Sequence, residues 1–241
     1  MDTVVFTDPK VIEFLTNEMA LVKIDAVADS LKAKESHISG YPTIIMIEQN
    51  GDEVDRVVGY LEPDSLIQKL RDYANGIGTL DDLLGKMAKK FDRKIAFEIG
   101  DKYKYRGGQE KARSWFQSVI DSGDPTDSLS GESRMALASI PYRDKNYDKA
   151  IKAYEKIMKD FQDTDFEEQS ELWCAYIIKK KGDTTAAIVA FEEFVEHYPK
   201  SEEIEWIQGQ ISKLKGEEPK EEQSEETKED SEEESKGEDE G

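Results

Sequence analysis

The sequence predicts three parts in order along the chain: a small α/β region, an all-α array of helical hairpins and a disordered acidic tail. Three observations predict this order. Two segments typical of strands, TIIMIE and EVDRVV, lie among helical patterns before residue 75. Three alanines then recur at intervals of 38 and 37 residues, as in repeated helix pairs. The last 26 residues contain 14 acids, three lysines and no apolar side chain, so they lack the material for a core.

Composition and charge exclude several classes of function. The chain carries 54 acidic and 33 basic residues, a net charge of -21, which repels a phosphate backbone, so we expect no nucleic-acid partner. No apolar run approaches the roughly 18 residues that cross a membrane. The start, MDTVVFTDPK, lacks the basic and apolar stretches of a signal peptide. We expect a soluble, cytoplasmic protein with no membrane contact; a true start further upstream would leave room for an export signal.

Cysteine and histidine are too few for two common chemistries. One cysteine, Cys174, and two histidines, His37 and His197, allow neither an internal disulfide nor a zinc site with several cysteines. Acidic residues are so numerous that no pair of them stands out as a catalytic dyad. We therefore predict no metal site, no cofactor and no catalytic residue in these 241 residues.

The first elements of the α/β region are a helix, a strand and a second helix. Asp8 followed by Pro9 is typical of a helix start, and an apolar stripe continues the helix to about residue 18. Residues 20–25, ALVKID, have the pattern of a short strand. Residues 28–36 predict a polar helix.

A hairpin and a third helix complete this region. The strand over residues 43–48 is almost wholly apolar, which predicts burial on both faces. Asn50-Gly51 is a strong turn signal and joins it to a strand over residues 53–58. Pro63 begins a helix. That helix carries three apolar residues, Leu66, Ile67 and Leu70.

This order of elements resembles the later part of a thioredoxin-fold domain. The matching phrases are Val22-Lys23-Ile24-Asp25, Gly40-Tyr41-Pro42-Thr43, Asn50-Gly51 and Gly59-Tyr60. The resemblance implies that Pro42 follows a cis peptide bond and that Tyr41, Pro42 and Thr43 form the loop that lies against a bound substrate peptide. An ordinary turn with a trans proline is the alternative.

The sequence also departs from the thioredoxin family. In that family a Cys-x-x-Cys motif opens the helix before the segment that corresponds to Phe6-Thr7-Asp8-Pro9, and the present sequence has no such motif. The family's first strand and the strand leading to its active site are missing as well. We therefore expect residues 1–75 to be the C-terminal portion of a thioredoxin-like domain, truncated at its N-terminus.

A linker and a capping helix are predicted over residues 76–94. Gly76-Ile77-Gly78 lacks the third glycine of a dinucleotide-binding loop and is interpreted as a linker. Thr79 and Asp82 have the spacing of a capping box at the start of a helix.

Residues 95–215 resemble three tetratricopeptide repeats. Ile99-Gly100-x2-Tyr103 followed by Ala112-x3-Phe116 has the internal spacing of one repeat, and Ala150-x3-Tyr154 and Ala187-x3-Phe191 continue the series. Pro141 is expected to end or kink its helix early. Cys174 takes an apolar position and is interpreted as a buried structural thiol. Generic helix pairs remain the alternative to this family.

The resemblance implies that the first helix of each pair lines a concave peptide-binding groove. It would offer seven residues: Lys104, Tyr105, Tyr142, Arg143, Tyr176, Lys179 and Lys180. Such cations and aromatic rings suit an extended acidic peptide or a C-terminal carboxylate. The tail, residues 216–241, is the nearest candidate, and we hypothesise that it docks there. Ordinary solvated helix faces and a merely solubilising tail are the alternatives.

Two classes of function remain. The chain is predicted to act as a non-catalytic module that binds a protein or peptide. The alternative is a thiol-disulfide oxidoreductase of the thioredoxin family whose Cys-x-x-Cys lies upstream of Met1, because exchange chemistry requires a thiolate pair.

Overall fold

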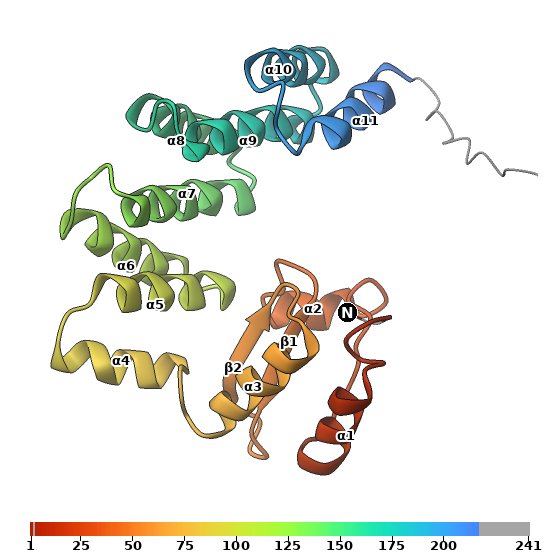
Figure 1. Cartoon of the computed structure of the whole chain (residues 1–241), viewed down its shortest axis with the longest axis vertical. Coiled ribbons are helices and arrows are strands. Elements are labelled where there is room, and N and C mark those ends of the chain that lie inside the picture. Colours follow the sequence, from red (N-terminus) through yellow and green to blue (C-terminus); the bar gives the residue numbers. More distant parts are fainter. Residues whose placement is uncertain (2, 217–241) are drawn as a thin grey trace, which may run out of the picture.

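The computed structural model describes residue 1 and residues 3–216, so the acidic tail lies almost wholly outside the described residues. A small α/β region comes first and a series of helices follows (Figure 1). The α/β region contains α1 (Pro9–Glu18), α2 (Ser30–Glu35), β1 (Thr43–Ile47), β2 (Glu53–Val58) and α3 (Pro63–Ala74).

The two strands form an antiparallel hairpin, as the turn signal predicts. Thr43 pairs with Val58 and Ile47 with Glu53, and the register shifts between Met46 and Ile47. Gly51 has a φ of 93°, a conformation that residues with a Cβ rarely adopt, so the turn depends on glycine. The predicted hairpin is confirmed.

The helices α1 and α3 supply the apolar core of this region. The Asp8 side chain caps α1 by accepting a hydrogen bond from the Lys10 amide, and Pro9 lies at the first helical position. Their buried residues form one cluster with Val5, which precedes α1: Val11, Phe14, Leu66, Ile67 and Leu70. The start signals and the apolar stripes predicted both helices correctly.

The strand predicted over residues 20–25 is wrong. The segment is extended but belongs to no sheet, because the sheet of the described residues contains β1 and β2 alone. Its apolar side chains are exposed, Val22 by 76%. The expectation that β1 is buried on both faces is also wrong, since its residues are half-buried and Ile47 is 59% exposed. A strand needs a hydrogen-bonding neighbour, and the described residues provide none for this segment.

The linker leads into α4 (Leu80–Lys89). The Thr79 hydroxyl accepts a hydrogen bond from the Asp82 amide, and the Asp82 carboxylate accepts one from the Gly78 amide. The Thr79 half of the predicted capping box is present, whereas Asp82 accepts from the residue before the N-cap instead of from the Thr79 amide.

Seven further helices form three hairpins and a final helix. They are α5 (Arg93–Tyr105), α6 (Gln109–Asp121), α7 (Ser128–Arg143), α8 (Tyr147–Asp160), α9 (Asp165–Lys181), α10 (Thr184–His197) and α11 (Ile204–Lys215). The three recurrent alanines, Ala112, Ala150 and Ala187, are fully buried on the second helix of each hairpin. At Gly100 a Cβ would lie 2.8 Å from the Phe116 ring, so glycine is needed for the close packing of α5 on α6.

Pro141 does not end its helix early. α7 continues to Arg143, with Pro141 buried in its last turn. The amide that proline lacks is therefore lost only near the helix end, and the carbonyls of Ile140 and Pro141 still accept hydrogen bonds from Asp144 and Asn146.

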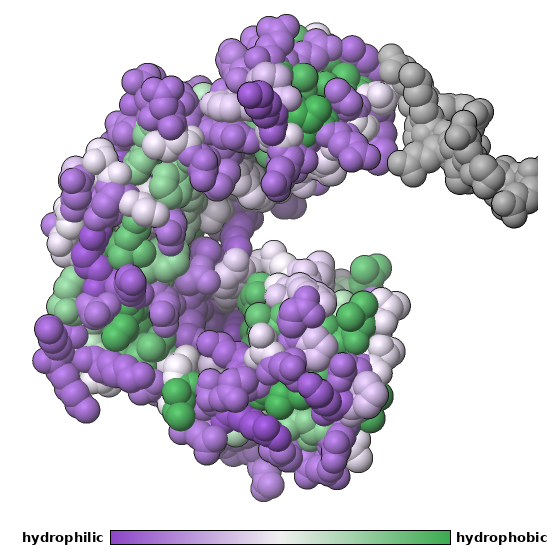
Figure 2. Space-filling model, viewed as in Figure 1, coloured by the Kyte–Doolittle hydropathy of each residue, from purple (hydrophilic) through white to green (hydrophobic). Residues whose placement is uncertain are grey.

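The helical hairpins follow an arc that begins beside β2 and ends at α11, across from α2 (Figure 1). The C-terminal ends of α5, α7 and α9 point to the side of the arc on which the α/β region lies. The space-filling view shows a hollow between the two, with hydrophilic residues over much of its wall (Figure 2). Of the helices described, none has the length and apolar character needed to cross a membrane.

Candidate functional site

The loop before β1 contains a cis peptide bond between Tyr41 and Pro42. The Pro42 carbonyl accepts a hydrogen bond from the Gly59 amide at 2.8 Å, and the Thr43 hydroxyl donates to the Gly40 carbonyl at 2.7 Å. These bonds hold the loop to the end of β2 and leave the Tyr41 side chain 71% exposed. The loop thus presents an aromatic ring to solvent.

A group of charged residues joins β2 to the first helical hairpin. We call Glu53, Asp55, Arg56, Lys102 and Arg106 the interdomain ion cluster. Asp55 is fully buried and accepts hydrogen bonds from the Lys102 ammonium at 2.9 Å and the Leu80 amide at 2.8 Å. An Arg106 Nη2 nitrogen lies 3.1 Å from its other oxygen. Two carboxylates and three cations therefore hold α5 against β2.

Burial and pairing shift two pKa values within this cluster. Burial lowers the pKa of Lys102, an effect that its hydrogen bond to Asp55 opposes. Burial works to raise the pKa of Glu53, but hydrogen bonds and charge interactions with Arg56 and Arg106 outweigh it and lower that pKa. Glu53 is thus held in its charged form by its two arginine partners.

Arg56 connects the cluster to the loop before Pro42. Its Nη1 donates to the Ser36 carbonyl at 3.0 Å and to the Tyr105 carbonyl at 2.7 Å. Next to it, His37 packs against Gly107, where a Cβ would lie 2.6 Å from the His37 Nδ1. The loop and the end of α5 are fixed to each other by these contacts.

Arg143 extends this junction to the second hairpin. Its Nη1 donates to the Ser39 hydroxyl at 2.9 Å, and its guanidinium lies over the Tyr105 ring at 4.7 Å. Cation–π contacts of this kind stabilise the position of an arginine. A single side chain therefore touches both the loop that contains Pro42 and the repeats.

Aromatic rings continue from Arg143 toward α11. The Tyr142 ring lies 5.6 Å from Trp173 and 6.2 Å from Tyr176, and the Tyr176 ring lies 6.3 Å from Trp206. The Lys180 ammonium lies over Tyr176 at 5.1 Å. Burial, and then the neighbouring Tyr176, raise the pKa of Tyr142 to about 12, so its hydroxyl stays protonated.

The predicted groove residues fall into two groups. Tyr105, Tyr142, Arg143, Tyr176 and Lys180 lie in the connected series just described. We call these five, together with the loop residues Tyr41, Pro42 and Thr43, the loop–repeat face.

The other two predicted groove residues are engaged elsewhere. Lys104 is buried, pairs with Asp101 and lies over the Tyr105 ring at 4.5 Å. Lys179 donates to the side chain of Gln210 on α11. Both ammonium groups are thus occupied within the chain.

Sequence reasoning missed four residues of this junction. Trp173 and Trp206 are aromatic and could have been found, since Trp173 lies one helical turn before Tyr176. Ser39 and Arg56 carry no pattern that assigns them to an interface with the repeats. Their role depends on a contact between segments far apart in the sequence.

Cys174 offers no reactive thiol. It is partly buried on α9, and burial raises the pKa of its thiol to about 12. A thiolate is the species that attacks a disulfide, so this residue is a packing element of the second hairpin's core. The interpretation as a structural thiol agrees with this environment.

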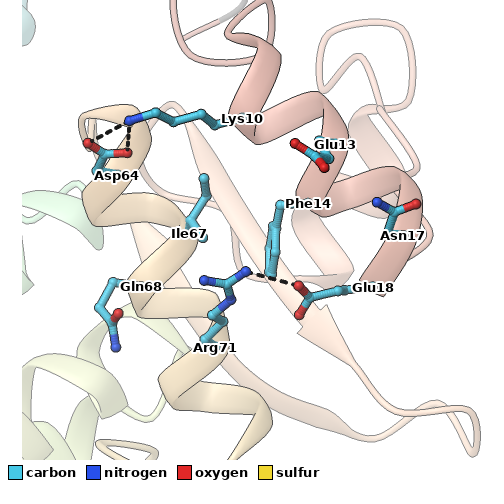
Figure 3. Close-up of a pocket in the computed structure, with 9 residues that line it drawn as sticks. All are labelled: Lys10, Glu13, Phe14, Asn17, Glu18, Asp64, Ile67, Gln68 and Arg71. Carbon is cyan, nitrogen blue, oxygen red and sulfur yellow. Dashed lines mark hydrogen bonds and ion pairs between the residues drawn. The ribbon is translucent and has the colours of Figure 1, made fainter.

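A shallow cavity of about 470 Å³ lies between α1 and α3 (Figure 3). Two ion pairs cross it, Lys10 with Asp64 at 2.9 Å and Arg71 with Glu18 at 3.0 Å. The Arg71 guanidinium also lies over the Phe14 ring at 5.1 Å. Each cation is paired with a carboxylate of the other helix, so we interpret the cavity as a contact between α1 and α3. Within the described part of the chain, no three potential metal ligands come together.

Two family models match parts of the chain. A thioredoxin-like domain model matches residues 1–74, and the model of the YfiO outer membrane lipoprotein family matches residues 136–225. The second match begins within α7 and leaves α5 and α6 outside it. No curated protein matches the chain. Together with the helical hairpins of the structure, these matches identify the chain as a thioredoxin-like domain followed by a repeat domain of the tetratricopeptide type.

Proposed function

We propose that the loop–repeat face binds an extended segment of a partner protein and performs no chemistry on it. The observation that carries this proposal is the position of Arg143, which donates to Ser39 of the loop and lies over Tyr105 of the first hairpin. This contact joins the loop to the repeats and supports a binding surface that includes both.

The chemistry of this face favours a partner segment with acidic groups. Arg143 and Lys180 supply positive charge in a chain whose net charge is -21. Tyr105, Tyr142 and Tyr176 supply stiff, amphipathic contact area, which loses little conformational entropy on binding. Acidic side chains or a terminal carboxylate would pair with the cations, and the segment's apolar groups would pack on the rings.

The second candidate is thiol-disulfide exchange by a longer form of the protein. The thioredoxin-like match over residues 1–74 favours it. Within these 241 residues the only thiol is that of Cys174, whose pKa is raised to about 12. Reduction of insulin disulfides above background by a form extended upstream of Met1, surviving Cys174→Ser, would favour this second candidate.

A peptide-display selection on the full chain tests the binding function. We expect the selected extended peptides to be enriched in Asp and Glu. Their affinity should fall about tenfold in Arg143→Ala and in Tyr176→Ala, because truncating a central contact commonly has this effect. Lys152→Ala, which removes an exposed charge of α8 outside this face, is the matched control. Selected peptides that bind both variants and the control equally would refute the proposal.

The acidic tail would compete for the same face. Comparing the full chain with a variant that ends at Lys215, by backbone NMR at low and high salt, tests this. Tail docking predicts that the resonances of Tyr142 and Tyr176 move when the tail is deleted, and only at low salt. Unchanged resonances at low salt would contradict the docking of the tail.

A further inference from the structure

A second groove lies between α6, α7 and α8, away from the loop–repeat face. It has a volume of about 630 Å³, and the two surfaces share no residue. None of the residues that line the groove is acidic, and four are cations: Arg113, Arg134, Lys149 and Lys156. The chain has 54 acidic and 33 basic residues, so a groove whose charged lining residues are all basic is unexpected and indicates a binding surface for anions.

The two lysines of this groove hold no partner among the residues that the structure describes. Among the described residues, neither the Lys149 nor the Lys156 ammonium makes a hydrogen bond or an ion pair, and both side chains are exposed. The arginines differ, because Arg134 pairs with Asp160 at 2.5 Å while the nearest carboxylate oxygen to Arg113 belongs to Glu110, at 3.7 Å. Lys149, Lys156 and, in part, Arg113 are therefore open to an external anion.

The floor of the groove is apolar. Ile120, Leu137 and Ala153 line it, one from each of the three helices, and each remains only half-buried. The lining contains no aromatic ring on which a nucleic-acid base could stack, and the net charge of the chain repels a phosphate backbone. The floor and the rim together suit a ligand with one apolar face and acidic flanks.

The spacing of the lining residues gives the groove a length. Residues 113–120 of α6, 134–141 of α7 and 149–157 of α8 each contain eight or nine residues, about two helical turns or 11 Å. Most backbone groups along these three helices are already paired within each helix, the Leu137 carbonyl opposite Pro141 excepted. An extended peptide would find few backbone partners here, whereas a helix brings its own hydrogen bonds satisfied.

We propose that this groove binds an acidic amphipathic helix of a partner protein. Apolar side chains at positions i, i+3 or i+4, and i+7 of that helix pack on Ile120, Leu137 and Ala153. Its acidic side chains pair with Lys149 and Lys156 at one rim and with Arg113 at the other. The groove thereby gives the chain a binding surface in addition to the loop–repeat face, for a ligand of different shape.

A designed probe tests this assignment on the full chain. The probe is a fluorescein-labelled synthetic peptide of about 16 residues, long enough to populate a helix, with Leu on one helical face and Glu and Ala elsewhere. Fluorescence anisotropy should show binding that weakens as salt is added. The double variant Lys149→Glu with Lys156→Glu should lose about tenfold or more in affinity, because two attractions become repulsions.

A matched control variant shows whether the loss of peptide affinity is specific to the groove. Lys152→Glu with Lys159→Glu makes the same charge change at the same spacing on α8, at exposed residues outside the groove. It should retain the affinity to within about twofold. An equal loss in both double variants would show that only net charge matters and would overturn the proposal. Equal circular dichroism spectra establish that both variants are folded.

Further measurements distinguish an amphipathic helix from other ligands of the groove. A peptide of the same charge with Gln in place of Leu should bind at least about tenfold more weakly, since it leaves the apolar floor unfilled. Equal binding of this peptide, or of a single-stranded oligonucleotide of equal charge, would mean that the groove recognises anions alone and would overturn the assignment of a helix.

Sedimentation tests whether a second copy of the chain occupies the groove. Without peptide, the sedimentation of the chain should be unchanged by Lys149→Glu with Lys156→Glu. A shift from dimer to monomer would identify a second copy as the occupant and overturn the proposal.

Discussion

The repeats bury their apolar side chains, whereas part of the thioredoxin-like region leaves them exposed. In the third hairpin and α11, Phe191, Phe194 and Ile207 are fully buried. In the segment between α1 and β1, Val22 is 76% exposed and Val27 87% exposed. Both segments carry large apolar side chains, so the difference arises from the neighbours that these side chains find.

The two regions differ in the distance along the chain between contacting elements. Each helix of a hairpin packs mainly on the helix before it and the helix after it, so a repeat completes its core locally. A strand in the middle of a sheet needs partners that come from distant positions. The α/β region therefore depends on long-range contacts, and the interdomain ion cluster supplies one set of them.

The largest expected effect comes from Phe191→Ala in the repeats. Removing this fully buried ring leaves a cavity in the third hairpin and should lower the free energy of unfolding by about 4 kcal/mol. Trp115, Trp173 and Trp206 all lie in the repeats, and the Trp206 ring lies 6.1 Å from Phe191. Urea unfolding followed by tryptophan fluorescence therefore reports on this region.

Val189→Ala is the matched control for this prediction. Val189 is on the same helix but 48% exposed, so its truncation should cost well under half as much. A loss of less than about 1 kcal/mol for Phe191→Ala would contradict the close packing of the repeats.

The next largest effect concerns the junction between the two regions. Asp55→Ala removes a fully buried carboxylate and leaves Lys102 and Arg106 without it, which should cost about 3 kcal/mol. The loss should appear mainly as faster amide hydrogen exchange in β1, β2 and α3, while α8 to α10 keep their protection.

Asp81→Ala is the control at the same end of the molecule. Asp81 is exposed in the first turn of α4, so its loss should cost at most about 1 kcal/mol. If Asp55→Ala left the exchange of β1 and β2 unchanged, the α/β region would be stable without the ion cluster, and the contrast between the two regions would fail.

The same contrast explains how much of the fold was predictable. The helices were predictable because their signals are local: Asp8 caps α1, Thr79 caps α4, and Ala112, Ala150 and Ala187 mark the three hairpins. The strand over residues 20–25 was predicted from the same kind of local pattern and is wrong, since a ladder requires a neighbour that a local pattern does not reveal.

The candidate site was predictable only in part, for a related reason. A family resemblance nominated Tyr41, Arg143 and Tyr176 as candidates, because each belongs to a recognisable motif or helix. It gave no indication that Ser39 would meet Arg143, 104 positions later in the chain. Lys104 shows the opposite error, since its pattern suggested an open groove cation and its ammonium is paired with Asp101.

A smaller effect tests the electrostatics of the repeats. The His197 Nδ1 lies 2.7 Å from the Glu171 carboxylate, and this hydrogen bond, followed by the charge of Glu171, raises the pKa of His197 above 6.5. The folded pKa exceeds the unfolded one. The stabilisation is therefore fully present below about pH 6.5 and is lost as the pH rises through the folded pKa.

Because His197 is largely exposed, this stabilisation should be at most about 1 kcal/mol. An NMR titration of the imidazole should show that Glu171→Gln lowers the pKa of His197. Glu193→Gln, which alters a weaker charge interaction with the same histidine, should lower it less. Equal changes in the pKa of His197 in both variants would contradict a specific role of Glu171 in raising that pKa.

The smallest expected effect concerns the exposed segment of the α/β region. Val27→Ser and Val22→Ser replace side chains that are 87% and 76% exposed, so each should change the free energy of unfolding by less than about 0.5 kcal/mol. Val11→Ser, at a fully buried position of α1, is the matched control and should be strongly destabilising. Circular dichroism during urea unfolding at two protein concentrations measures all three. A loss of more than about 1 kcal/mol for Val27→Ser would mean that this side chain is covered in solution. If that loss grew with protein concentration, the cover would be a second copy of the chain; in either case the contrast between an open α/β region and closed repeats would no longer hold.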